Sequence, residues 1–164
     1  MRNALPFREK TECFLVTRTG QVVAQDRGNY VMFSGGGIDP GENLLRSARR
    51  EIVEEIGATV SGLRHLATVD WVWFPEWASN AKQRQRYTEF QGERVHIIVG
   101  FVDSFGRSTS TEGDAWAGKK TMSIGRCLDL VRRYGSKDHP NTYPYRIAQE
   151  MALQYLALLA KSGP

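Results

Sequence analysis

The chain has 164 residues, of which 41% are hydrophobic and 24% are charged, and these ordinary globular values exclude intrinsic disorder, collagen-like repeats and coiled coils. The 22 Lys and Arg residues outnumber the 18 Asp and Glu residues, and the net charge of +4 favours a nucleic-acid or phosphorylated partner. The two cysteines lie in no zinc-binding or disulfide pattern, so we expect a cytoplasmic location. No signal peptide and no apolar run of ~20 residues is present, so we expect no membrane partner.

The first third of the chain combines short β-prone runs with a glycine-rich segment. The runs lie at 13–16, 22–24 and 30–33. Thr19 and Gly20 predict a hairpin turn between the first two runs. Consecutive glycines follow the third run, so we expect it to end in a loop at 34–37 that a ligand can approach closely.

A helix is predicted to begin after Asn43, which can cap its N-terminus, and to end at Gly57. Its apolar residues recur at helical spacing, at Leu45, Ala48, Ile52 and Ile56. The first predicted helix is therefore amphipathic and packs on a sheet by one face.

Beyond this helix, the pattern alternates again between strands and helices. Strands are predicted within 58–74 and 94–102. Amphipathic helices are predicted within 123–134 and 145–161. Two polar segments, 75–91 and 105–120, are predicted to be linkers that do not divide the chain, so we expect a single α/β domain over residues 1–164.

Three glutamates of the first helix are candidates for a metal site. Glu51, Glu54 and Glu55 are spaced i, i+3 and i+4, so they share one face of the helix. Converging carboxylates repel one another unless a cation compensates them, and oxygen ligands of this kind suit Mg²⁺ or Mn²⁺. The alternative is an ordinary solvated face on which Arg50 pairs with Glu54.

The sequence around these glutamates resembles the Nudix box, the signature of the Nudix hydrolases. Gly36 is followed after five residues by Glu42 and after seven more by Arg-Glu-Ile-Val-Glu-Glu-Ile-Gly-Ala at 50–58, so the box covers 36–58. The resemblance implies a Nudix-type α/β/α sandwich with a mixed β-sheet. It also implies hydrolysis of a nucleoside diphosphate linked to another group, by metal-assisted attack of water on phosphorus.

The resemblance also assigns roles to the residues of the box. It implies that Glu51, Glu54 and Glu55 bind Mg²⁺ or Mn²⁺ together with a backbone carbonyl near Gly36. It implies catalytic roles for Glu51 and Glu54, and for Arg50 in holding a catalytic glutamate. Glu42 would support the loop or reach a metal through water.

Some family members use a further carboxylate, outside the box, as general base. The candidates in or beside the linkers are Glu89, Glu93, Glu112 and Asp114, of which we put Glu93 and Glu112 first. Each can equally be an ordinary surface acid. His96 alternates with the apolar face of its strand and can touch substrate or be structural.

An aromatic and basic segment is the best candidate for gripping a nucleotide. Trp77, Arg84 and Arg86 can stack on a base and neutralise phosphates. Trp71 and Trp73 share one strand face, so the alternative is that both are core residues and the basic run is a mobile loop.

The sequence therefore predicts a Nudix pyrophosphohydrolase that acts on a small nucleotide, with a housecleaning enzyme for nucleoside triphosphates slightly favoured. ADP-ribose or a nucleotide sugar remains an alternative substrate, and a non-catalytic nucleotide sensor an alternative function. No recognised nucleic-acid-binding motif is present, although a cap-cleaving enzyme would unite both types of partner. The sequence does not define the oligomeric state, and a homodimer is one option because many members of the family that the chain resembles form homodimers.

Overall fold

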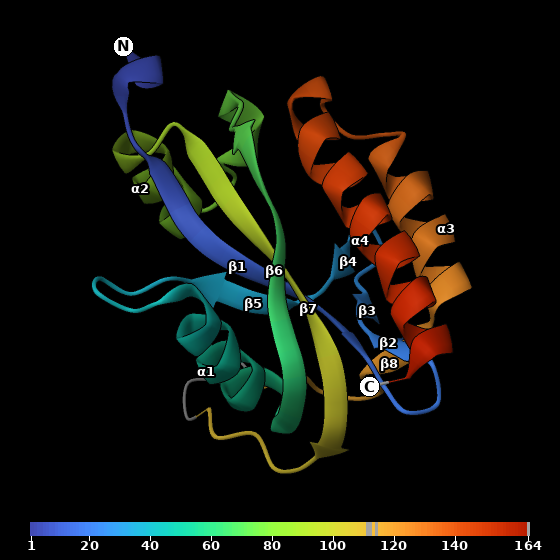
Figure 1. Ribbon diagram of the computed structural model, residues 1–164. Coiled ribbons are helices and arrows are strands. Elements are labelled where there is room, and N and C mark those ends of the chain that lie inside the picture. The colour runs from blue at the N-terminus through green and yellow to red at the C-terminus, as the bar shows by residue number, and fades with distance from the viewer. Residues whose placement is uncertain (111–112, 114, 164) are drawn as a thin grey trace.

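The fold is built on a mixed β-sheet with helices on both faces, as seen in a computed structural model that describes residues 1–110, 113 and 115–163 (Figure 1). The main sheet contains β1 (Phe7–Val16), β2 (Gln21–Val23), β5 (Ser34–Gly37), β6 (Ala58–Val72), β7 (Gly92–Phe105) and β8 (Thr121–Ser123). The strands β3 (Gln25–Asp26) and β4 (Val31–Met32) form a separate pair. The helices are α1 (Leu44–Ile56), α2 (Ala81–Glu89), α3 (Ile124–Gly135) and α4 (Tyr143–Ser162). Short 3₁₀ turns are η1 (Arg2–Ala4), η2 (Pro75–Trp77) and η3 (Pro140–Thr142).

The strand order is β6-β7-β1-β2-β8, and β5 pairs with β1 beside this path. The central pair, β1 and β7, is parallel, whereas β1–β5 and β6–β7 are antiparallel. The predicted α/β/α sandwich with a mixed sheet is therefore confirmed. No helix within the described part of the chain is long and apolar enough to span a membrane.

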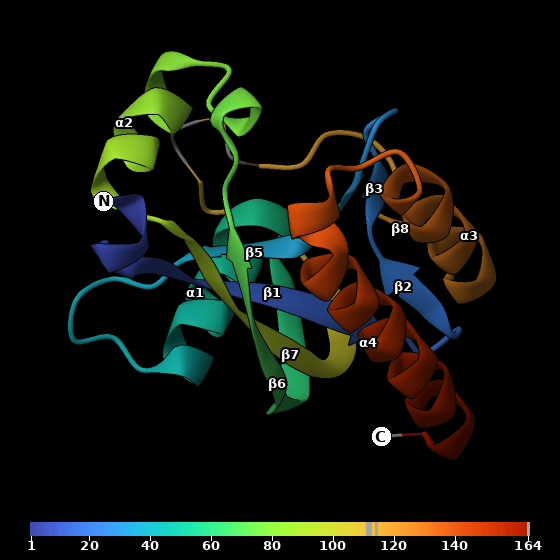
Figure 2. The same cartoon turned by 90° about the horizontal axis from the view of Figure 1, so that it is seen from above.

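Two apolar layers fill the space on either side of the sheet. Because side chains alternate along β1, Cys13 and Leu15 pack against α1, whereas Phe14 and Val16 pack on the opposite face. That opposite layer includes Leu153 and other apolar residues of α3 and α4. Figure 2 shows α3 and α4 side by side and away from α1. Helices therefore pack on both faces of the sheet.

The first helix forms as the sequence predicts. The Asn43 side chain accepts a hydrogen bond from the Arg46 amide at 2.8 Å, and Gly57 ends the helix in a left-handed conformation with φ of 64°. Ala48, Ile52 and Ile56 are fully buried. Leu45 is 37% exposed, so it lies at the margin of the apolar stripe.

Two sequence predictions about the connections are wrong. The segment 34–37 is a strand, β5, because its backbone pairs with β1 despite its glycines. The segment 75–91 is not a mobile linker, since it contains η2 and α2. The residues of α2 are almost all polar, so no apolar periodicity predicts this helix. Asn80 caps its N-terminus, since its side-chain oxygen accepts a hydrogen bond from the Gln83 amide at 2.9 Å.

Candidate active site

A cleft of about 620 Å³ lies beside β5 and the acidic face of α1, and we call it the main cleft. Three acidic side chains line it, from Glu51, Glu55 and Glu93. Five basic side chains surround them: Arg8, Lys10, Arg27, Lys82 and Arg86. The backbone of Gly35, Gly36 and Gly37 forms part of its wall. The cleft therefore combines metal-binding chemistry with an electropositive surround suited to phosphates.

Arg50 organises the acidic residues of the box. Its guanidinium donates two hydrogen bonds to the Glu42 carboxylate, at 2.9 and 3.0 Å, and its Nη1 donates to Glu51 at 3.0 Å and to Glu54 at 3.2 Å. Its Nη2 also donates to the Gly37 carbonyl at 3.1 Å. The hydrogen bonds from Arg50 lower the pKa of Glu42 to about 2. Arg50 thus ties the loop before α1 to the carboxylates on α1.

Glu55 is held by three donors, two from β5 and one from Trp116. The Gly35 amide donates to its Oε1 at 2.7 Å and the Ser34 hydroxyl at 3.1 Å, while the Trp116 indole donates to its Oε2 at 3.1 Å. Burial nevertheless raises the pKa of Glu55 to about 7, because desolvation of the carboxylate outweighs these hydrogen bonds. A cation in the main cleft would stabilise the charged form.

Gly36 leaves the space that the Glu51 carboxylate occupies. A Cβ atom at position 36 would lie 2.5 Å from Glu51 Oε1 and 2.6 Å from its carboxyl carbon. The close approach places the carboxylate against the β5 backbone, on the wall of the main cleft. A side chain at position 36 would therefore push the Glu51 carboxylate away from the β5 backbone.

We expect Gly36→Ala to lower kcat on the order of a hundredfold, because it displaces the Glu51 carboxylate by an ångström or more. The matched control is Gly125→Ala in α3, where a Cβ meets nothing within 4 Å and no left-handed conformation is required. Steady-state kinetics of the two variants, with thermal melting to confirm folding, test this. Equal activities would show that Gly36 is not needed to seat Glu51.

The donor set fits a hard divalent cation in its chemistry. Glu51, Glu55 and the Gly36 backbone line one cleft and offer only oxygen atoms. Glu54 lies on the same helix but turns toward Arg50 and does not line the cleft. Throughout the described ranges, no three His, Cys, Asp or Glu side chains are close enough to form a ready-made metal site. Glu54 would have to leave Arg50 to complete a three-carboxylate set.

The candidate general bases differ in their placement. Glu93 lines the main cleft, is 8% exposed and accepts a hydrogen bond from Arg8 Nη1 at 3.1 Å. Glu89 is an exposed residue at the end of α2. Glu112 and Asp114 lie outside the described residues. His96 contacts Glu9 and Thr68 and does not line the cleft.

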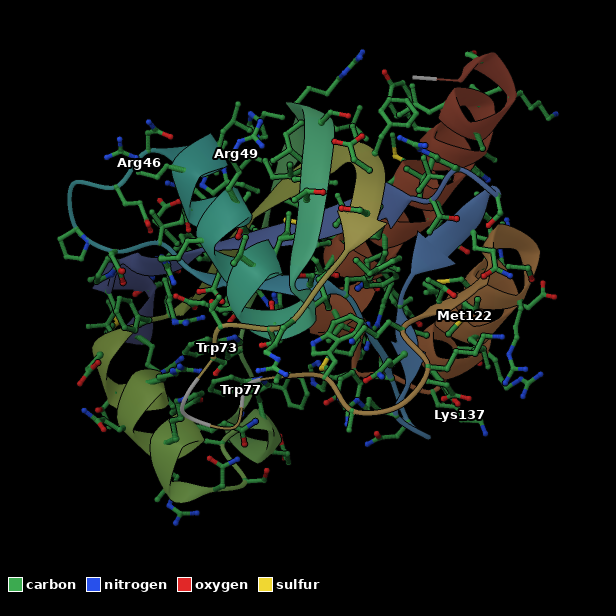
Figure 3. The ribbon with its side chains drawn as sticks, turned by 90° about the horizontal axis from the view of Figure 1, so that it is seen from below. Arg46, Arg49, Trp73, Trp77, Met122 and Lys137 are labelled. Atoms are coloured by element: carbon green, nitrogen blue, oxygen red, sulfur yellow. The ribbon has the colours of Figure 1, made fainter. Side chains whose placement is uncertain are left out.

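Of the three residues predicted to bind substrate, only Arg86 lines the main cleft. Lys82 also lines the main cleft, because it lies four residues before Arg86 on the same face of α2. Arg84 lies two residues from each of them, so it is on a different face and is exposed outside the cleft. Trp77 stacks on Trp73, with ring centroids 3.7 Å apart, and Figure 3 shows the two side by side near α2. Trp71 and Trp73 are 7% and 2% exposed, so the alternative that they are core residues is correct.

Arg8, Lys10 and Trp116 belong to the site but were missed from the sequence. Arg8 and Lys10 reach the cleft through the pairing of β1 with β5 and β7, which no local pattern encodes. Burial alone would lower the pKa of Lys10, but Glu93 and Glu12 outweigh it and raise this pKa, so the ammonium stays charged. The sequence does show that Arg8 and Lys10 are two residues apart, which places both on one face of a strand.

Comparison with known proteins gives a consistent result. Residues 2–116 match the family model of the NUDIX domain. An RNA pyrophosphohydrolase of Wolbachia sp. subsp. Brugia malayi (strain TRS) is 33% identical over 89 residues, which cover 48% of this chain and 55% of that protein. The chain therefore matches about half the length of this curated relative.

Solved structures show the same fold at low sequence identity. The E. coli dihydroneopterin triphosphate pyrophosphohydrolase has a TM-score of 0.57 and 13% identity, with 93% of this chain and 98% of that chain covered. A NUDIX hydrolase from Nitrosomonas europaea has the same TM-score and identity, with 89% of each chain covered. At this level of identity, the similarities support the fold alone.

Proposed function

The chain belongs to the Nudix family, and from this we propose that it is a divalent-metal-dependent pyrophosphohydrolase acting on nucleoside di- or triphosphates or on nucleoside diphosphate derivatives. Water would attack phosphorus in the diphosphate linkage. Glu51, Glu54, Glu55 and the Gly36 carbonyl would hold Mg²⁺ or Mn²⁺. When bound, the metal lowers the pKa of a water molecule and neutralises charge on the phosphate oxygens.

One observation carries this proposal: two carboxylates of the Nudix box, Glu51 and Glu55, share a cleft with five basic side chains. A metal-bridged polyphosphate needs both, because the metal binds some of its oxygens and cationic side chains bind the others. Glu93 is the preferred candidate for the general base, since it lines the same cleft. Its carboxylate is held in place by an ion pair with Arg8, at 3.1 Å.

The test is a panel of nucleotides incubated with the protein and Mg²⁺, with release of phosphate and pyrophosphate measured. The panel includes nucleoside triphosphates, ADP-ribose and nucleotide sugars. We expect one class to be cleaved with Mg²⁺ and none with EDTA. Saturable binding without cleavage would instead support a nucleotide sensor. The absence of both binding and cleavage would contradict the proposal.

We expect Arg86→Ala to raise KM roughly tenfold with little change in kcat, because it removes a charged contact to the substrate polyphosphate. Arg86 is half-buried near Arg8, and its pKa is lowered mainly by burial and also by the positive charge of Arg8. An anion bound between the two guanidiniums would relieve this repulsion. Arg46→Ala is the control, because Arg46 projects outward from α1 (Figure 3). An unchanged KM in Arg86→Ala would remove this residue from the substrate site.

A second candidate substrate is an RNA with a 5′-triphosphate. The curated relative is called an RNA pyrophosphohydrolase. In addition, Arg27 and Ala117 of the main cleft also line a second cavity of about 430 Å³, which contains Lys119 and Arg126. Such a basic extension would suit the phosphates of following nucleotides. Faster cleavage of 5′-triphosphorylated oligonucleotides than of mononucleotides would favour RNA. The double variant Lys119→Glu with Arg126→Glu should then abolish this preference.

A further inference from the structure

The chain that follows β7 returns to the C-terminal end of α1, as Figure 1 shows. Backbone amides of Gly106, Thr109 and Trp116 donate to the carbonyls of Gly57, Val53 and Glu55, at 2.8, 3.4 and 2.9 Å respectively. The Ser108 hydroxyl donates to the Glu54 carbonyl. The carbonyls at a helix end lack partners within the helix. The returning segment therefore fixes the last turn of α1, which carries Glu54 and Glu55.

The approach of this segment also explains the glycine at the end of the box. A Cβ at position 57 would lie 2.5 Å from the backbone of Gly106 and Arg107. Gly57 is therefore needed both for its left-handed conformation and for the passage of the returning chain. The contact is direct, backbone against backbone.

Trp116 is a residue of this segment whose side chain hydrogen-bonds to Glu55 in the main cleft. It is 6% exposed, it lines the main cleft, and its indole nitrogen lies 3.1 Å from Glu55 Oε2. The other carboxylate oxygen, Oε1, is already fixed by Ser34 and Gly35. Trp116 thus fixes the oxygen that the β5 contacts leave unconstrained.

We propose that Trp116 is a positioning residue that orients the Glu55 carboxylate for binding a divalent cation. The inference rests on the proposed function, because it takes Glu55 as a metal ligand. Partners that hydrogen-bond to a metal ligand fix its orientation, and their removal typically weakens metal binding 10- to 100-fold. An indole has only one donor, so its hydrogen bond leaves the other lone pairs of Oε2 available to a cation.

The experiment measures Mn²⁺ binding to the whole protein by electron paramagnetic resonance of free Mn²⁺, without substrate. We expect Trp116→Phe to weaken binding roughly tenfold. Because phenylalanine also leaves a cavity, a second variant carries β-(3-benzothienyl)alanine at 116, where sulfur replaces the indole N–H and the ring shape is kept. Trp77→Phe is the matched control, and we expect its Mn²⁺ affinity to stay within about twofold of the wild type.

Tryptophan fluorescence gives an independent readout. Bound Mn²⁺ should quench the emission of Trp116 in the wild type and in Trp77→Phe. Both variants at position 116 lack this indole, so loss of quenching in them would assign the quenched emission to Trp116 and place the cation beside it. Wild-type Mn²⁺ affinity in both of those variants would overturn the positioning role while leaving the proposed function intact. If the wild type itself binds no Mn²⁺, the metal site of the proposed function fails first.

Discussion

Replacement of Glu54 or Glu55 by Gln is expected to lower kcat by on the order of a thousandfold at saturating Mg²⁺. Each change removes a negative charge from the proposed metal site, and metal assistance contributes several kcal/mol to stabilisation of the transition state. The two residues act from different positions, since Glu55 lines the main cleft whereas Glu54 pairs with Arg50 at 3.2 Å. Release of phosphate from the preferred nucleotide is the measurement.

Folding should survive both changes. A glutamine at 55 keeps an acceptor for the Ser34 hydroxyl and the Gly35 amide; it loses the acceptor for the Trp116 indole, but it also removes a carboxylate that is costly to bury. Circular dichroism and thermal melting provide the control. Full turnover in either folded variant at saturating Mg²⁺ would remove that residue from the metal site.

The second large effect is expected for Arg50→Met, which should lower the free energy of unfolding by about 3 kcal/mol and kcat by on the order of a hundredfold. The Arg50 side chain is 29% exposed, and its guanidinium pairs with three glutamates of the box, so its loss leaves their charges uncompensated. Arg50→Lys should not restore activity, because an ammonium cannot reproduce the two-nitrogen contact with Glu42. Urea unfolding and steady-state kinetics measure the two effects.

The control for Arg50 is Arg49→Met on the same helix. Arg49 donates a hydrogen bond to the Val60 carbonyl at 3.1 Å and is exposed, so we expect a change within about 0.5 kcal/mol. The effect of Arg50→Met should also depend on pH. Since the folded pKa of Glu42 is lowered from 4.5 to about 2, its contribution is complete above pH 4.5 and is lost as the pH falls toward 2. A pH-independent difference between variant and wild type would contradict the Arg50–Glu42 pair.

The first helix and the family could be predicted from the sequence because their signals are local. Asn43, Gly57 and the spacing of Ile52 and Ile56 define the helix, and all their effects act within one or two turns. The Nudix box likewise fixes residue types over a short stretch, and the family comparison confirms it.

The remainder of the candidate site depends on contacts between distant residues. Arg8 meets Glu93 only because β1 pairs in parallel with β7, and Trp116 meets Glu55 only because the chain returns to α1. Tertiary contacts of this kind leave no periodic trace in the sequence. Trp77 was predicted as a stacking surface for a base, but its ring is stacked on Trp73.

The arrangement also explains the net positive charge of the chain. The box concentrates glutamates on α1, whereas the cationic side chains of the main cleft come from β1, from α2 and from Arg27 beside β3. An acidic centre inside a basic rim attracts a polyphosphate only when a metal ion joins the two. Under the proposed function, the net charge of +4 therefore reflects the binding of a polyphosphate and not general nucleic-acid binding.

The most direct test of the central claim is hydrolysis of the preferred nucleotide in ¹⁸O-labelled water with Mg²⁺, followed by ³¹P NMR of the products. The account predicts that one phosphoryl product carries a single ¹⁸O atom and that EDTA abolishes its formation. Hydrolysis that proceeds equally in EDTA, or label found only in a non-phosphoryl product, would contradict metal-assisted attack of water on phosphorus.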